Sequence, residues 1–233
     1  MPSAKPPVTH VIFDFDGLLV DTEPCYTLAN QAMLKKYGKE FTMELKGGMM
    51  GCKNMEAIAW LLEQVGIADC VSPEEYVIEY DAMLADMFRK CNSMPGAERL
   101  VRHLASKGVP MAICTGSCSR TFAQKAQKHR DWIDIIPIHV LSGDDENIKR
   151  GKPFPDPFLE TMKRFPHIPT DPSHVLVFED APNGVKAAYA AGMQCVMVPD
   201  QAFLEHARLL CVDNVLSSLE DFKPEEFGLP AFD

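Results

Sequence analysis

The chain has no run of lysine or arginine and no cysteine pair of the C-x-x-C type. Its 33 acidic residues outnumber the 23 basic ones, which gives a formal net charge of -10 at pH 7. A nucleic acid or an anionic membrane is therefore not expected as a partner. Eight cysteines in 233 residues are too few for a disulfide-rich scaffold, and they predict reduced thiols.

The sequence also lacks a long apolar run. Its start, M-P-S-A-K-P-P, has no apolar stretch of the kind that a signal peptide carries, and no segment reaches the ~20 apolar residues of a membrane helix. We therefore expect a cytoplasmic protein. The 46% of hydrophobic residues is enough for a sizeable core, in one large domain or in a domain with a lid.

Four short apolar segments, each closed by polar, glycine or proline residues, predict buried β-strands. They are Thr9–Asp14, Met111–Thr115, Val175–Phe178 and Gln194–Val198. Helical patterns that end at Gly108 and Gly192 precede two of these strands. This alternation predicts an α/β fold, a Rossmann-like parallel sheet with helices on both faces, whose ligands bind beyond the carboxyl ends of the strands.

An insertion after the first strand is far too long for a single crossover helix. The sequence S-P-E-E from Ser72 to Glu75 has the form of a capping box at a helix start. Apolar stripes at helical spacing, one from Tyr76 to Phe88 and one from Met55 to Val65, predict a small separate core. We therefore expect a small all-helical cap domain at 22–92 and a Rossmann-like core domain formed by 1–21 and 93–233.

Two aspartates at the end of the first predicted strand are the first candidates for chemistry. Asp14 and Asp16 are two positions apart, so an extended backbone directs both side chains the same way. Two neighbouring carboxylates repel each other, and a cation or a shared proton relieves this. Gly17 permits a sharp turn with positive φ directly after them. The alternative is that these residues form an exposed Asp-Gly turn that has no catalytic role.

Polar residues also follow the second predicted strand. Thr115, Gly116 and Ser117 lead into a helix whose first N–H groups suit an anion, although Thr115 could be a plain helix cap. Further on, Lys152 in G-K-P is a cation before a stiff turn, and an ordinary surface lysine is the alternative. The surrounding letters do not form a P-loop.

Two acids end the third strand, where a sheet normally has apolar residues. Carboxylates such as those of Glu179 and Asp180 are preferred ligands of Mg²⁺, whereas a helix cap by Asp180 is the plain alternative. An acidic protein that handles phosphate needs such a metal or a local cluster of donors.

In order, D-F-D-G-L-L-V-D-T-E, C-T-G-S, G-K-P-F-P-D-P-F and F-E-D-A-P-N-G resemble the four motifs of the haloacid dehalogenase-like (HAD) hydrolase superfamily. The resemblance spans nearly the whole chain, and the helical insertion resembles the small cap of the subgroup that includes β-phosphoglucomutase. Segments outside the motifs, among them H-V-L-S-G-D-D and A-A-G-M-Q-C-V-M-V-P-D, resemble animal pseudouridine-5'-phosphatases. The resemblance implies a Mg²⁺-dependent phosphatase of a small phosphorylated metabolite, with pseudouridine 5'-phosphate as the expected substrate.

The resemblance also implies a role for each matching residue. Asp14 would form an aspartyl-phosphate, and Asp16 would act as general acid and then as general base. Thr115 and Lys152 would complete the catalytic set. The residues expected to bind phosphate or substrate are Gly17, Thr115, Gly116, Ser117, Lys152, Glu23 and Lys53. The expected metal ligands are Asp14, Asp16 through its carbonyl, Asp180 and Glu179, the last directly or through water.

Other functions remain open on these residues. One is a phosphatase for another sugar or polyol phosphate, and a second is a β-phosphoglucomutase-type isomerase that retains a bisphosphate. A third is a non-catalytic binding protein, which the presence of both Asp14 and Asp16 disfavours. A dehalogenase has no use for an acid at Asp16 or for Mg²⁺. We expect a monomer.

Overall fold

The computed structural model describes residues 5–49, 54–200, 204–207 and 214–233. The chain forms two compact units, Met1–Asp21 with Asn92–Asp233, and Thr22–Cys91. Asn92, which the sequence analysis assigned to the insertion, belongs to the first unit, where its carbonyl accepts a hydrogen bond from the Asp21 N–H at 2.9 Å. Within the described ranges, no helix combines the length and the apolar character needed to cross a membrane.

The described part of the first unit is built on a parallel sheet in the order β3-β2-β1-β4-β5-β6. The strands are β1 (His10–Phe13), β2 (Met111–Thr115), β3 (Ile138–Leu141), β4 (Val175–Glu179), β5 (Gln194–Met197) and β6 (Asn214–Val215). Phe13 lies opposite Ile113 on one side and Phe178 on the other, so β1, β2 and β4 end at the same edge.

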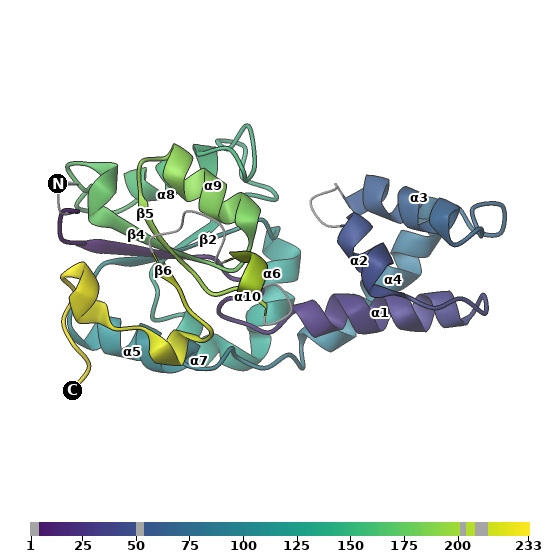
Figure 1. The fold of residues 1–233 in the computed structure, drawn as a ribbon, viewed down its shortest axis with the longest axis horizontal. Helices are drawn as coiled ribbons and strands as arrows, with labels where there is room; N and C mark the ends of the chain where they lie inside the picture. The colour runs from purple at the N-terminus through teal and green to yellow at the C-terminus, as the bar shows by residue number, and fades with distance from the viewer. Residues whose placement is uncertain (1–4, 50–53, 201–203, 208–213) are drawn as a thin grey trace. The chain divides into compact units, whose positions relative to one another are not determined.

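Helices cover both faces of this sheet, which confirms the predicted fold class. Figure 1 shows α8 (Asp156–Lys163) and α9 (Pro182–Ala190) on one face, with α5 (Ala97–Ser106) and α7 (Arg130–Ile133) on the other. The described residues of this unit also form the α-helices α6 (Ser119–Ala126) and α10 (Leu204–Ala207). Phe158 of α8 and Val185 of α9 belong to one buried cluster with the strand residues Ile12 and Val177. This packing holds the strand ends, and the residues that follow them, in place.

Strands β3 and β6 are not among the four strands that the apolar segments predicted. Strand β3, with the sequence I-H-V-L, is only partly buried along its length, and β6 has two residues. Neither carries the continuous apolar run that predicts a fully buried strand.

In its described residues the second unit is helical. It consists of α1 (Glu23–Lys35), α2 (Met43–Met49), α3 (Asn54–Gln64) and α4 (Pro73–Phe88). The capping box is confirmed, because Ser72 N–H donates to Glu75 Oε2 at 3.1 Å and Glu75 N–H donates to Ser72 Oγ at 3.2 Å. The α4 stripe buries Tyr76, Tyr80, Leu84 and Phe88. The assignment of Met55 to a packed stripe is wrong, because its side chain is 41% exposed.

Asn30 of α1 forms a buried polar link to α4. Its Nδ2 donates to Tyr80 Oη at 3.2 Å, and its Oδ1 accepts from Tyr76 Oη at 3.3 Å. Asn30→Ala leaves buried hydroxyls without these partners, so we expect the free energy of unfolding to fall by about 1–3 kcal/mol. Urea unfolding measures this effect, with the exposed Asn147→Ala as the control. Equal midpoints for the two variants would contradict a structural role for Asn30.

Candidate active site

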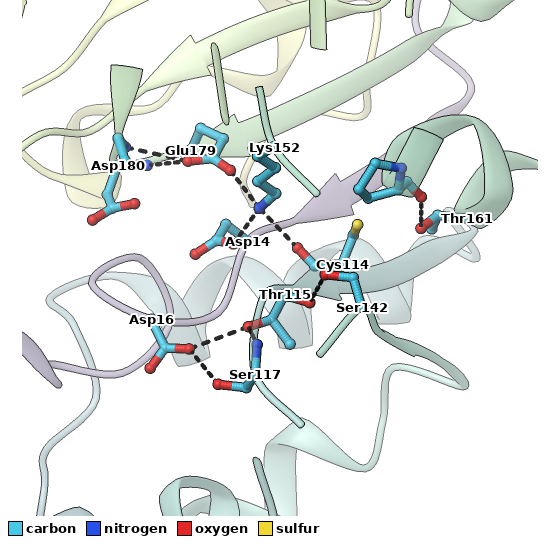
Figure 2. Close-up of polar contacts among 12 residues, drawn as sticks. Asp14, Asp16, Cys114, Thr115, Ser117, Ser142, Lys152, Thr161, Glu179 and Asp180 are labelled. Atoms are coloured by element: carbon cyan, nitrogen blue, oxygen red, sulfur yellow. Dashed lines mark hydrogen bonds and ion pairs between the residues drawn. The ribbon is translucent and has the colours of Figure 1, made fainter. Parts of the chain in front are cut away.

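Three neighbouring strands carry the acidic and hydroxyl groups of the site at their carboxyl ends. Asp14 follows β1, Thr115 is the last residue of β2, and Glu179 is the last residue of β4. All three side chains are buried, with relative exposures of 6%, 1% and 1%. Figure 2 shows the Asp14 and Glu179 carboxylates beside the amino group of Lys152, and the Thr115 hydroxyl directed toward Asp16. Parallel strands end at the same edge of a sheet, which explains why residues far apart in the sequence meet here.

Lys152, from the segment between β3 and α8, joins two of these carboxylates. Its Nζ lies 2.5 Å from Asp14 Oδ1 and 2.6 Å from Glu179 Oε1, and it donates to the Cys114 carbonyl at 3.1 Å (Figure 2). An ammonium group has three donors, and these contacts match that number. The surface-lysine alternative is therefore wrong, because the side chain is only 15% exposed.

Burial and neighbouring charges shift the pKa values of Asp14 and Lys152 in opposite directions. Burial, with the charges of Glu179 and Asp16, raises the pKa of Asp14 to about 7, although Lys152 pulls it down. Burial also pulls down the pKa of Lys152, but the charges of Asp14 and Glu179 outweigh it and raise that pKa well above its ordinary value. Lys152 is thus a permanent cation beside an aspartate that burial disfavours as an anion.

Asp14, Glu179 and Asp180 form a cluster that could hold a metal ion. Each offers a carboxylate oxygen, and these oxygens lie within 4.8 Å of one another. Gly17 has φ +74°, and a Cβ there would overlap the Asp180 carboxylate, so glycine lets the backbone approach this group. Hard, closely spaced oxygen donors fit a small divalent cation such as Mg²⁺.

Glu179 uses both of its oxygens within the protein. Oε1 contacts Lys152, and Oε2 accepts from the N–H groups of Asp180 and Ala181 at 3.1 and 3.2 Å. These groups stand at the start of α9, whose cap residue is Ala181, so the helix-cap alternative for Asp180 is wrong. A Cβ at Gly184 would overlap the Glu179 carboxylate, so this glycine makes the close approach of α9 possible.

Asp16 lies in a separate set of donors. Its Oδ2 accepts from Thr115 Oγ1 at 3.1 Å and from Ser117 Oγ at 2.9 Å (Figure 2). Thr115 is not the cap of α6, because that position belongs to Cys118 and the Thr115 hydroxyl accepts from Ser117 N–H at 3.0 Å. Both donors of Ser117 are therefore directed to other protein groups in this structure.

Sequence reasoning missed Lys125. This α6 lysine is 2% exposed, and its Nζ lies 2.5 Å from Asp16 Oδ1. A signal was present, because Phe122, Lys125 and Ala126 occupy one helical face and the other two residues are apolar. A lysine on an apolar face needs a buried partner, and here Asp16 is that partner.

For three other predicted residues, Gly116, Glu23 and Lys53, the structure gives no contact that tests a role in substrate binding. Gly116 is exposed and directly follows Thr115. Glu23 is the first residue of α1 in the helical unit, where its carboxylate lies 3.3 Å from Lys46 Nζ. Lys53 lies outside the described residues. The substrate-binding roles of these three residues stay predictions.

Buried carboxylates and lysines gather at the carboxyl edge of a Rossmann-like sheet, which is the place where α/β proteins of this class bind their ligands. The sequence identifies the family, because residues 11–198 match the model of the haloacid dehalogenase-like hydrolases. The chain belongs to the haloacid dehalogenase-like hydrolases, as its motifs predicted.

Individual proteins extend this similarity over nearly the whole chain. "(DL)-glycerol-3-phosphatase 1, mitochondrial" of Arabidopsis thaliana is 49% identical over 97% of this chain and 75% of its own length. "Probable pseudouridine-5'-phosphatase" of Drosophila melanogaster is 43% identical over 97% of this chain and 96% of its own. These relatives support the enzyme class that the sequence predicts, a phosphoric monoester hydrolase.

A solved structure shows the same fold. The HAD family hydrolase from Deinococcus radiodurans R1, crystallised with phosphate and sodium, superposes with a TM-score of 0.77. The two sequences are 22% identical, and the match covers 97% of this chain and 99% of the other.

Proposed function

We propose that this protein is a Mg²⁺-dependent phosphatase that hydrolyses a small phosphate monoester through a phosphorylated Asp14. The observation that carries the proposal is the contact of Lys152 with both Asp14 and Glu179. The contact fixes one oxygen of Asp14, and it places a cation where the charge of a phosphoryl group needs compensation. The second oxygen of Asp14 is the nucleophile.

The reaction has two steps. Asp14 attacks phosphorus, the bond from phosphorus to the leaving oxygen breaks, and Asp16 gives that oxygen a proton. Asp16 then takes a proton from water as the water oxygen attacks phosphorus, which releases inorganic phosphate and regenerates Asp14. Thr115 and the main chain at Gly116 bind the phosphoryl oxygens.

The charges of the site favour a divalent cation. Four carboxylates (Asp14, Asp16, Glu179 and Asp180) accompany two lysines, Lys125 and Lys152, which leaves two negative charges when every group is ionised. Asp14 and Asp180 would hold Mg²⁺, with the Asp16 carbonyl, while Glu179 orients Lys152 and contacts the metal through water. Bound Mg²⁺ would neutralise charge that develops on the phosphoryl group.

The substrate is a phosphate ester of a primary alcohol on a polyol or a nucleoside. Glycerol 3-phosphate and pseudouridine 5'-phosphate, the compounds after which the two relatives are named, both have this chemistry. Pseudouridine 5'-phosphate is the candidate that the resemblance of segments outside the four motifs implied. Glycerol 3-phosphate is supported by the higher identity of its relative.

A phosphate-release assay tests this proposal. The panel is glycerol 3-phosphate, glycerol 2-phosphate, pseudouridine 5'-phosphate and uridine 5'-phosphate, each with Mg²⁺ and with EDTA. We expect one primary-alcohol ester to be preferred, and chelation to lower its rate at least ~100-fold, because a metal contributes several kcal/mol to such a reaction.

Each result of the panel has a distinct meaning. Equal rates for pseudouridine 5'-phosphate and uridine 5'-phosphate would remove the narrower assignment. A rate that is independent of Mg²⁺ would contradict the metal role, and turnover that requires a bisphosphate activator would favour the isomerase.

A further inference from the structure

The two aspartates that follow β1 have separate lysine partners. Lys152 contacts Asp14, whereas Lys125 contacts Asp16. The proposed mechanism gives Lys152 a direct role, but it makes no use of Lys125. A buried lysine is costly unless its charge is matched, so its place beside one catalytic group calls for an explanation.

Lys125 holds Asp16 through a closed set of contacts. Its Nζ lies 2.5 Å from Asp16 Oδ1 and donates to Ser117 Oγ at 2.9 Å. The Ser117 hydroxyl in turn donates to Asp16 Oδ2 at 2.9 Å. Both oxygens of the Asp16 carboxylate are thereby fixed, one by the ammonium group and one by the hydroxyl.

Lys125 and Asp16 differ in their exposure to solvent. The Lys125 side chain is 3% exposed, whereas that of Asp16 is 23% exposed. The cation is thus enclosed beneath a carboxylate that reaches the surface of the unit. This arrangement suits a residue that acts through Asp16 and does not itself contact a substrate.

We propose that Lys125 is a positioning residue, which holds the Asp16 carboxyl at the place where it transfers a proton to the leaving oxygen. This inference rests on the proposed phosphatase reaction. Esters of primary alcohols need that proton, because an alkoxide is a poor leaving group. The p-nitrophenolate ion leaves without a proton from the enzyme. A variant that is impaired only in proton transfer therefore keeps its activity on p-nitrophenyl phosphate, whereas a variant that is impaired in another step loses activity on both esters.

The test compares kcat/KM for p-nitrophenyl phosphate with that for the primary-alcohol ester that the panel ranks first. This parameter covers the steps up to loss of the leaving group. For Lys125→Met we expect a loss of about 100-fold with the alkyl ester and of at most about threefold with the aryl ester. Lys125→Arg, which keeps the charge, should recover part of the alkyl activity. Lys163→Met, which removes an exposed lysine of α8, is the matched control.

A double variant keeps the test valid if Lys125→Met folds poorly. Asp16→Asn with Lys125→Met removes both charges of the pair, which is milder than leaving one of them unpaired. If Lys125 acts through Asp16, the double variant and Asp16→Asn alone have equal kcat/KM for both esters. A further loss of about tenfold in the double variant would overturn the proposal.

The failures of the two proposals are distinguishable. If the wild-type protein releases no phosphate from any ester, the phosphatase reaction itself is wrong. If the wild type is active and Lys125→Met loses the same factor with the alkyl and aryl esters, the reaction stands. Lys125 then binds phosphate or supports the fold, and the positioning role is wrong.

Discussion

Asp14→Asn is expected to lower kcat for phosphate release by at least about 10³-fold, because removal of a catalytic nucleophile has effects of this size or larger. An amide cannot form the acyl phosphate, and its nitrogen cannot accept the hydrogen bond that Lys152 donates to Asp14 Oδ1. Steady-state release measures the loss. Rapid acid quench of the wild type with ³²P-labelled substrate should trap label on the protein, and the variant should trap none.

The control for this experiment is a surface aspartate. Asp134→Asn removes an exposed carboxylate that pairs with Arg130 at 3.0 Å, and its kcat should equal that of the wild type. Phosphatase activity retained by Asp14→Asn, or label trapped on that variant, would exclude Asp14 as the nucleophile.

Lys152→Met is expected to impair both catalysis and stability. It removes the cation from Asp14 and Glu179, which are buried, and the loss of one partner of a buried ion pair costs about 3–5 kcal/mol of unfolding free energy. We expect kcat to fall at least ~100-fold, because removal of one preorganised charge-stabilising group has effects of this size. Urea unfolding and phosphate release measure the two effects.

Added Mg²⁺ should restore part of the lost stability, since it also compensates the carboxylates. Lys149→Met is the control, because Lys149 lies three residues earlier, is exposed, and donates to the Glu146 carbonyl. If Lys152→Met unfolds at the wild-type urea concentration, the buried ion pairs do not stabilise the protein.

Much of the architecture was predictable from local patterns. Short apolar segments identified four strands, and their alternation with helices predicted a parallel sheet, because near-continuous apolar strands are typical of a sheet that helices cover on both faces. The capping box at Ser72 was also predictable from a local pattern, because its hydrogen bonds join residues that are three apart in the sequence. Strands β3 and β6 were missed because one is half-exposed and the other has two residues.

The amino-acid sequence alone showed that Asp14, Asp16 and Asp180 lie at or just after the ends of predicted strands and that Lys152 precedes a stiff turn, and so it identified these residues as candidates. Tertiary structure alone decided which of these side chains share a contact, because their partners come from strands and loops far away in sequence. Lys152 proved to be a buried bridge, Glu179 its second partner, and Lys125 the partner of Asp16. A helix pattern shows that Lys125 lies on an apolar face, but only the folded structure places it beside Asp16, because the two residues are far apart in the sequence.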